Sequence, residues 1–183
     1  MDRNDAIEAL RATGDELEAS GFTEPVNIVL AGAVAAMVTG GLPASRGTHD
    51  CDVVLIDPDD RWNVVRNAAR AVARQRRLPP DWFNRDSQMY AYLLPLGWRG
   101  RCEAVGSFGP LVVTSVGRRD LLAMKLAGSP VRPQDQDDLV SMKPTTEELT
   151  FLEEHLDRLE AESLAGETFE AQRAILDQLR LAS

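Results

Sequence analysis

One stretch of the chain fixes a strand and the helix that follows it. Residues 51–56 are apolar except for Asp52 and rich in branched side chains, which predicts a strand. They run into Asp57-Pro58-Asp59-Asp60, a sequence typical of a helix start, and residues 62–76 have the apolar spacing of a helix. The chain must therefore combine strands with helices.

The remaining pattern gives a strand-rich middle and a helical tail. Short strands between glycine turns are predicted at Gln88–Leu94, Arg101–Val105 and Leu111–Val116. Helices are predicted at Asn4–Ser20, Gly117–Ala127, Gln134–Met142, Thr146–Glu162 and Phe169–Leu181. Periodicity leaves open whether residues 27–39 begin as a strand or go directly into a helix. This order predicts an α/β (α+β) fold, a mixed sheet flanked by helices, with a domain at residues 1–143 and a C-terminal helical extension at 144–183 packed on it.

Two aspartates stand at the start of the strand predicted at 51–56. Asp50 and Asp52 are two residues apart, so their side chains share a face of a strand. Carboxylates held so close repel each other unless a cation lies between them. Oxygen-only ligation suits Mg²⁺ or Mn²⁺, which take further ligands from water and substrate phosphates. The pair predicts a site of phosphoryl or nucleotidyl transfer, or alternatively a strand start with both carboxylates in water.

The sequence before the pair favours the first interpretation. An apolar run contains the small step Gly32-Ala33, which would let the backbone approach a phosphate. A helix starting near Gly32 would direct its N-terminal amides at an anion. A loop rich in Gly, Pro and Ser then leads to Arg46 and Thr48.

Together these residues resemble the first motif of nucleotidyltransferases of the DNA polymerase β superfamily. The closer resemblance is to small bacterial nucleotidyltransferase-like proteins related to abortive-infection toxins, whose pattern is Gly-Gly-x-Ala, a short helix and Arg-x-Thr-x-Asp-x-Asp. The matching residues are Gly32, Ala35, Arg46, Thr48, Asp50 and Asp52. Ala33 replaces the second glycine, and the loop before Arg46 is a few residues longer. The resemblance implies that Asp50 and Asp52 bind the metal.

A second block strengthens the resemblance. Residues 121–126, Leu-Leu-Ala-Met-Lys-Leu, and residues 132–139, Arg-Pro-Gln-Asp-Gln-Asp-Asp-Leu, are similar to that group's Met-Lys-Leu helix and its Arg-x-x-Asp-x-x-Asp-Leu segment. The resemblance implies that Lys125 reaches the nucleotide phosphates and that Asp135 belongs to the active centre. Alternatively, Asp135 and Asp138 cap or solvate a helix start. Glu103, in a predicted strand, is a second candidate for a third carboxylate.

The resulting hypothesis is a metal-dependent nucleotidyltransferase that moves an NMP group from an NTP to RNA, a protein or a small molecule, in a toxin–antitoxin setting. Its predicted catalytic residues are Asp50, Asp52, Asp135 and Lys125, with Mg²⁺ or Mn²⁺ as cofactor. The predicted nucleotide contacts are Gly32, Ala33, Arg46, Thr48 and Lys125. The alternatives are a catalytically degenerate binding or antitoxin-like protein of the same fold, favoured by Ala33, and an adaptor whose helical tail docks a protein partner.

Composition limits the partners and the compartment. The net charge of −9 argues against general DNA binding, while a local basic face around Arg70–Arg77 stays open beside the alternative of a solvated helix. No apolar run is long enough to span a membrane. Two cysteines are too few for a disulfide framework or a zinc site, so a cytoplasmic protein is expected. We expect His49 to point away from the aspartate pair and His155 to be exposed.

Overall fold

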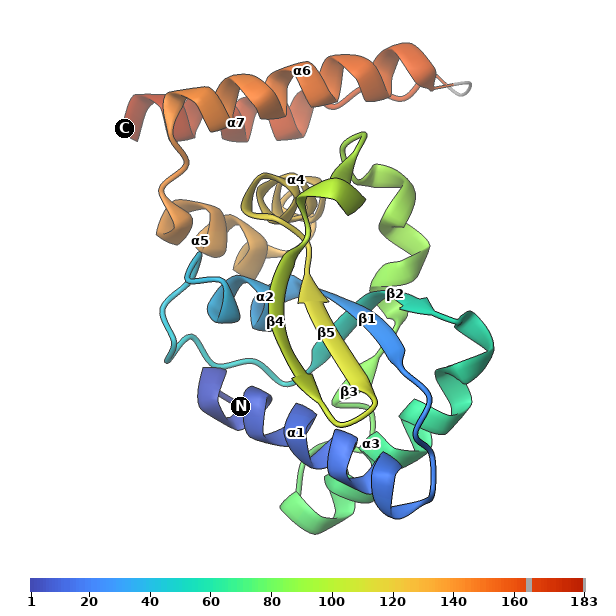
Figure 1. Cartoon of the computed structure of the whole chain (residues 1–183). Helices are drawn as coiled ribbons and strands as arrows, with labels where there is room; N and C mark the ends of the chain where they lie inside the picture. The colour runs from blue at the N-terminus through green and yellow to red at the C-terminus, as the bar shows by residue number, and fades with distance from the viewer. Residues whose placement is uncertain (164–165, 183) are drawn as a thin grey trace.

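A five-stranded mixed sheet forms the centre of the computed structural model, which describes residues 1–163 and 166–182 (Figure 1). The strands are β1 (Val26–Ala31), β2 (Cys51–Asp57), β3 (Phe83–Asn84), β4 (Glu103–Phe108) and β5 (Leu111–Ser115), in the order β3-β2-β1-β5-β4. Strand β1 pairs with β2 antiparallel and with β5 parallel. The β2–β3 pair is parallel, and the β4–β5 pair is antiparallel.

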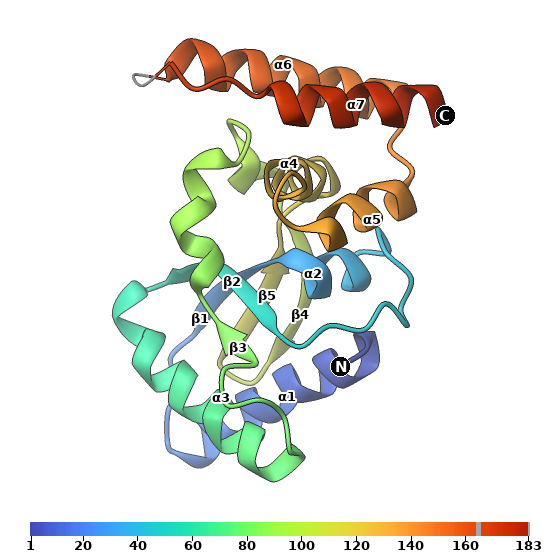
Figure 2. The same ribbon diagram turned by 180° about the vertical axis from the view of Figure 1, so that it is seen from behind.

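Helices lie on both sides of this sheet. They are α1 (Arg3–Ala19), α2 (Gly32–Val38), α3 (Trp62–Arg76), α4 (Arg118–Gly128), α5 (Pro133–Met142), α6 (Thr146–Glu162) and α7 (Glu170–Ala182). Short 3₁₀ helices are η1 (Asp59–Arg61), η2 (Asp86–Leu93) and η3 (Trp98–Arg101). Figures 1 and 2 show α1 beside α3 at one end of the molecule and α6 with α7 at the opposite end. The prediction of a mixed sheet flanked by helices with a helical C-terminal segment is confirmed.

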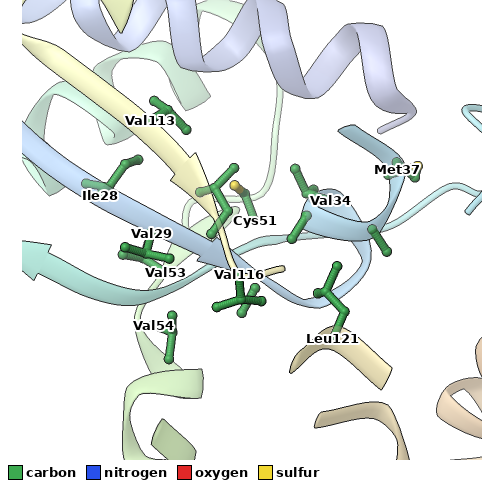
Figure 3. Close-up of a cluster of buried hydrophobic side chains, with 14 of the residues drawn as sticks. Ile28, Val29, Val34, Met37, Cys51, Val53, Val54, Val113, Val116 and Leu121 are labelled. Carbon is green, nitrogen blue, oxygen red and sulfur yellow. The ribbon is translucent and has the colours of Figure 1, made fainter. Parts of the chain in front are cut away.

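The core joins the central strands to α2 and α4. Strand β1 is almost wholly buried because it has a neighbour on each side and helices above it. Figure 3 shows Ile28, Val53 and Val113 of three adjacent strands in one apolar cluster with Val34 of α2 and Leu121 of α4. Burying such side chains stabilises the fold by about 1.5–3 kcal/mol each. The core therefore holds α2 and α4 firmly at one end of β1 and β2.

Two sequence predictions for the strands need correction. Residues 88–94 do not form a strand but lie mostly in η2, which packs on β2 without pairing with it. Tyrosines favour strands only where neighbouring side chains cover them, and here Tyr92 and Met89 are exposed. The strand predicted at 101–105 begins two residues later and runs to Phe108. The open question at residues 27–39 is resolved as a strand followed by a helix.

The C-terminal helix α6 packs against α4 and against the end of η2. Its Leu149, Leu152 and Leu156 are buried, and Arg118 Nε donates to Glu148 Oε1 at 2.7 Å. The expectation that His155 is exposed is wrong, because its side chain is 6% exposed and its Nε2 lies 2.9 Å from the Leu93 carbonyl oxygen. Burial lowers the pKa of His155. In the described residues, no helix is long and apolar enough to cross a membrane.

Candidate functional site

The turn between β1 and α2 brings a glycine against the aspartate pair. Ala31, the last residue of β1, pairs with Asp52 of β2, so Gly32 follows directly beside it. Gly32 has a φ of +69°, in the left-handed region that favours glycine. A methyl group at this position would clash with the Asp52 carboxylate. Both the backbone conformation and the close carboxylate therefore require glycine here.

Asp50 and Asp52 line the same cavity, as their spacing predicts. Asp50 immediately precedes β2, and Thr48 Oγ1 donates to its Oδ1 at 3.1 Å. Cys51, between the two aspartates, is fully buried in the core. Because β2 turns Cys51 inward, the two carboxylates face the cavity together.

The cavity has a volume of about 320 Å³, and two helices form its walls. Helix α4 contributes Leu121, Met124, Lys125 and Gly128, which lie on one face at helical spacing. Helix η2 contributes Ser87, Tyr90 and Leu93, three residues apart and therefore aligned on a 3₁₀ helix. The cavity thus joins a pair of carboxylates to apolar and aromatic side chains.

The charge of the aspartate pair is only partly balanced, because the nearby cations Arg132 and Lys125 do not form ion pairs with it. In residues 1–163 and 166–182, neither Asp50 nor Asp52 forms an ion pair. Burial and the adjacent Asp50 charge raise the pKa of Asp52 to about 6, although a hydrogen bond with Asn84 and the charges of Arg132 and Lys125 act in the opposite direction. Two adjacent carboxylates without an ion-pair partner attract a cation.

A second pair of aspartates, on α5, is fully neutralised. Lys125 Nζ lies 2.6 Å from Asp135 Oδ1 and 2.7 Å from Asp138 Oδ2. Arg46 Nε donates to Asp138 Oδ1 at 2.6 Å, and Arg132 Nε donates to Asp135 Oδ2 at 2.6 Å. Three cations thus face two carboxylates, each of which is 2% exposed. This network ties α4, α5 and the loop before β2 together.

The network determines what the residues of the second sequence block can do. Lys125 lines the cavity, but its amine is already held by two carboxylates. Arg132 also lines the cavity and its side chain is 64% exposed, so it is the more accessible cation. Burial acts to raise the pKa of Asp138, but the hydrogen bonds from Arg46 and Lys125 outweigh it and lower the pKa.

Other predicted site residues lie outside the cavity lining. Ala33 is half-buried in the first turn of α2. Arg46 donates a hydrogen bond to Asp138, and Thr48 donates one to Asp50. His49 is exposed. Glu103 is exposed on β4, at the edge of the sheet that is three strands away from β2. The structure therefore does not bring Glu103 to the aspartate pair.

Sequence reasoning missed the contribution of η2. Asp86, Ser87 and Tyr90 line the cavity, and the Ser87 hydroxyl is buried without a hydrogen-bond partner in the described residues. Asn84 links this wall to the site, because its Oδ1 accepts from the Asp86 amide at 2.9 Å and its side chain hydrogen-bonds Asp52. No motif marks Asp86, Ser87 or Tyr90, and the strand predicted at 88–94 gave no reason to place Tyr90 here.

Asp50 and Asp52 could hold a divalent cation if water and phosphate oxygens completed its coordination. Within residues 1–163 and 166–182, no three His, Cys, Asp or Glu side chains are arranged to hold a metal ion. Mg²⁺ usually takes one or two carboxylates from the protein and completes its shell with water and phosphate oxygens. Asp50 and Asp52 supply those two carboxylates, and their unbalanced charge is the observation that supports the fit.

Comparison of the chain with family models, with curated proteins and with solved structures gave no match.

Proposed function

We propose that the protein is a Mg²⁺- or Mn²⁺-dependent nucleotidyltransferase of the DNA polymerase β type. The observation that carries this proposal is the aspartate pair, which has no ion-pair partner among the described residues and lies beside the Gly32 turn in a cavity with apolar walls. A nucleoside triphosphate has the matching features, namely a charged phosphate chain and a planar base. The protein would act in a reducing cytoplasm, in which Cys51 and Cys102 stay as thiols.

Each side chain has a distinct part in this proposal. Asp50 and Asp52 would hold the metal, with Thr48 fixing the first carboxylate and Asn84 the second. A bound metal would neutralise the charge of the phosphates during the displacement. Arg132 would contact the phosphate chain from the opposite wall, since it is the accessible cation. The base would lie against Tyr90 and the apolar side chains beside it.

The transfer step balances without any further reagent. A hydroxyl oxygen of the acceptor forms a bond to the α-phosphorus, and the bond from that phosphorus to the bridging oxygen breaks, so that pyrophosphate leaves. The hydroxyl proton would pass to Asp86, because this cavity carboxylate is committed neither to the metal nor to an ion pair of the described residues. Positioning and charge stabilisation would supply most of the rate.

One observation favours an alternative, a nucleotide-binding protein that does not transfer. Asp135, the third carboxylate that the sequence resemblance implies, is held by Lys125 and Arg132 and is 2% exposed. It has no free oxygen for a second metal. Binding and transfer must therefore be measured separately.

The test of transfer uses NTPs labelled at the α-phosphate. Each of the four is incubated with the protein and Mg²⁺ or Mn²⁺, with and without total RNA, and label is measured on RNA and on protein. We expect label on one macromolecule with one nucleotide, and none with the Asp50→Asn, Asp52→Asn variant. The matched control is Asp59→Asn, Asp60→Asn, which makes the same change at exposed positions outside the cavity. Nucleotide binding without transferred label would favour the alternative.

A further inference from the structure

Helix α3 exposes a row of arginines along one face. Arg66, Arg70 and Arg74 follow at four-residue steps, so they lie one above another about 6 Å apart along the helix axis. Arg77 comes next, at the C-terminal cap. Figure 2 shows α3 running away from the sheet toward the end of the molecule opposite α6 and α7.

These arginines lack the acidic partners that most other arginines of the chain have. In the described residues, none of the four forms an ion pair, and Arg66 bonds only Asn63 Oδ1, at 3.2 Å, while its Nε is buried and unpartnered. In contrast, Arg76 of the same helix pairs with Glu8 at 3.0 Å. In a chain with a net charge of −9, an uncompensated cationic row is a strong exception.

The row leads to the aspartate pair through a groove. This groove has a volume of about 330 Å³ and is lined by Arg66, Arg70 and Arg85, with Asp81 and Asp86 as its acidic residues. Asp86 also lines the candidate site. Asn84, another lining residue of the groove, hydrogen-bonds Asp52. The groove and the cavity therefore meet at the β3–η2 segment.

We propose that the arginine row and the groove bind the phosphate backbone of a single-stranded nucleic acid, whose end enters the cavity as the acceptor. The role as acceptor rests on the proposed nucleotidyl transfer. Arginine suits this task because its guanidinium matches phosphate geometry with two hydrogen bonds. A regular row of cations tracks a backbone of regularly spaced charges, which is the usual design of sequence-tolerant single-strand binding. The acidic remainder of the surface directs a polyanion to this one face.

The test measures binding of a fluorescein-labelled 12-nucleotide single-stranded RNA by anisotropy at several salt concentrations. The Arg70→Gln, Arg74→Gln variant should bind roughly tenfold more weakly at low salt. The slope of log affinity against log salt should fall by about 1.4, since each phosphate contact of a single strand contributes about 0.7. The matched control is Arg76→Gln, Arg180→Gln, which removes the same charge from arginines paired with Glu8 and Glu153. It should bind RNA like the wild type.

Equal weakening by the control variant, or no RNA binding by the wild type, would overturn the inference. Displacement of the RNA by polyglutamate of equal charge as readily as by unlabelled RNA would also overturn it, in favour of an acidic protein partner. The Asp50→Asn, Asp52→Asn variant separates this result from the proposed function. It should keep its RNA affinity while losing label transfer. RNA binding in a wild type that binds no nucleotide would refute the transfer proposal and leave the binding surface supported.

Discussion

The two aspartate pairs of this protein differ in how their charge is balanced. Asp135 and Asp138 are buried among three cations that come from α4 and from two loops. Asp50 and Asp52 border a cavity and form no ion pair within the described residues, and Asp52 has a raised pKa. The same residue type thus serves two purposes. The compensated pair holds helices α4 and α5 together, whereas the uncompensated pair is where we propose that a cation binds.

The largest effect should come from breaking the compensated pair. Lys125→Met leaves two buried carboxylates without their shared cation, and such a loss costs about 3–5 kcal/mol of unfolding free energy. Urea unfolding measures this directly. Lys125→Arg keeps the positive charge and should lose much less unfolding free energy. A Lys125→Met protein as stable as the wild type would show that the network contributes little.

The Gly32 turn gives the next largest effect. Gly32→Ala forces a side chain into a left-handed conformation, at a cost of about 1–3 kcal/mol, and displaces the Asp52 carboxylate. We expect it to abolish nucleotide-dependent stabilisation. Gly40→Ala is the matched control, because Gly40 has a φ of +78° and open space where a Cβ would lie. It should lose stability but keep nucleotide binding. If both variants bind equally well, the turn is not part of the site.

The uncompensated pair should show a stabilising substitution. The pKa of Asp52 is higher in the folded than in the unfolded chain, so the wild type is penalised above pH 6, and the penalty disappears as the pH falls toward 4. Asp52→Asn should therefore raise the unfolding free energy by about 1 kcal/mol at pH 7.5 in the presence of a chelator. At pH 4 the gain should vanish. A loss of stability at pH 7.5 would mean that Asp52 has a favourable partner.

The smallest expected effect concerns His155, which joins α6 to the wall of the cavity. Its pKa is lowered in the folded state, so its contribution is fully present above the unfolded pKa of about 6.5 and is lost as the pH falls below it. His155→Gln keeps a donor for the Leu93 carbonyl. Between pH 6.5 and 5, the variant should lose less stability than the wild type, by under about 1 kcal/mol. If the difference in unfolding free energy between the two proteins stayed constant across this range, the lowered pKa of His155 would be contradicted.

The parts of the site that sequence predicts are those with local causes. A strand start with two aspartates and a small-residue turn are encoded within a few residues, and Asp50, Asp52 and Gly32 all line the cavity. The contacts of Lys125 could not be predicted, because they depend on packing of α5 on α4 and on Arg46, 92 residues away from Asp138. The motif placed Lys125 near the site but did not reveal that its charge is already matched.

The wall formed by η2 was beyond sequence reasoning for a different reason. The segment carries tyrosines, which favour strands, but its backbone does not pair with β2. It folds instead as a 3₁₀ helix that packs on β2. Short 3₁₀ helices have weak sequence signals because few hydrogen bonds define them. Ser87 and Tyr90 consequently entered the site only through tertiary structure. The class of fold, which depends on the order of strong elements, was predictable despite this error.

In the proposed function, the Asp50 and Asp52 carboxylates bind a nucleotide through a divalent metal. The most direct test is a thermal-shift panel of ATP, GTP, CTP and UTP with Mg²⁺ or Mn²⁺ on the wild type and on the Asp50→Asn, Asp52→Asn variant. A nucleotide at a hundred times its dissociation constant adds about 2.7 kcal/mol of stability. We expect a metal-dependent rise in the melting temperature of the wild type with at least one nucleotide and no such rise in the variant. No rise with any nucleotide, or an equal rise in the variant, would contradict the proposed function.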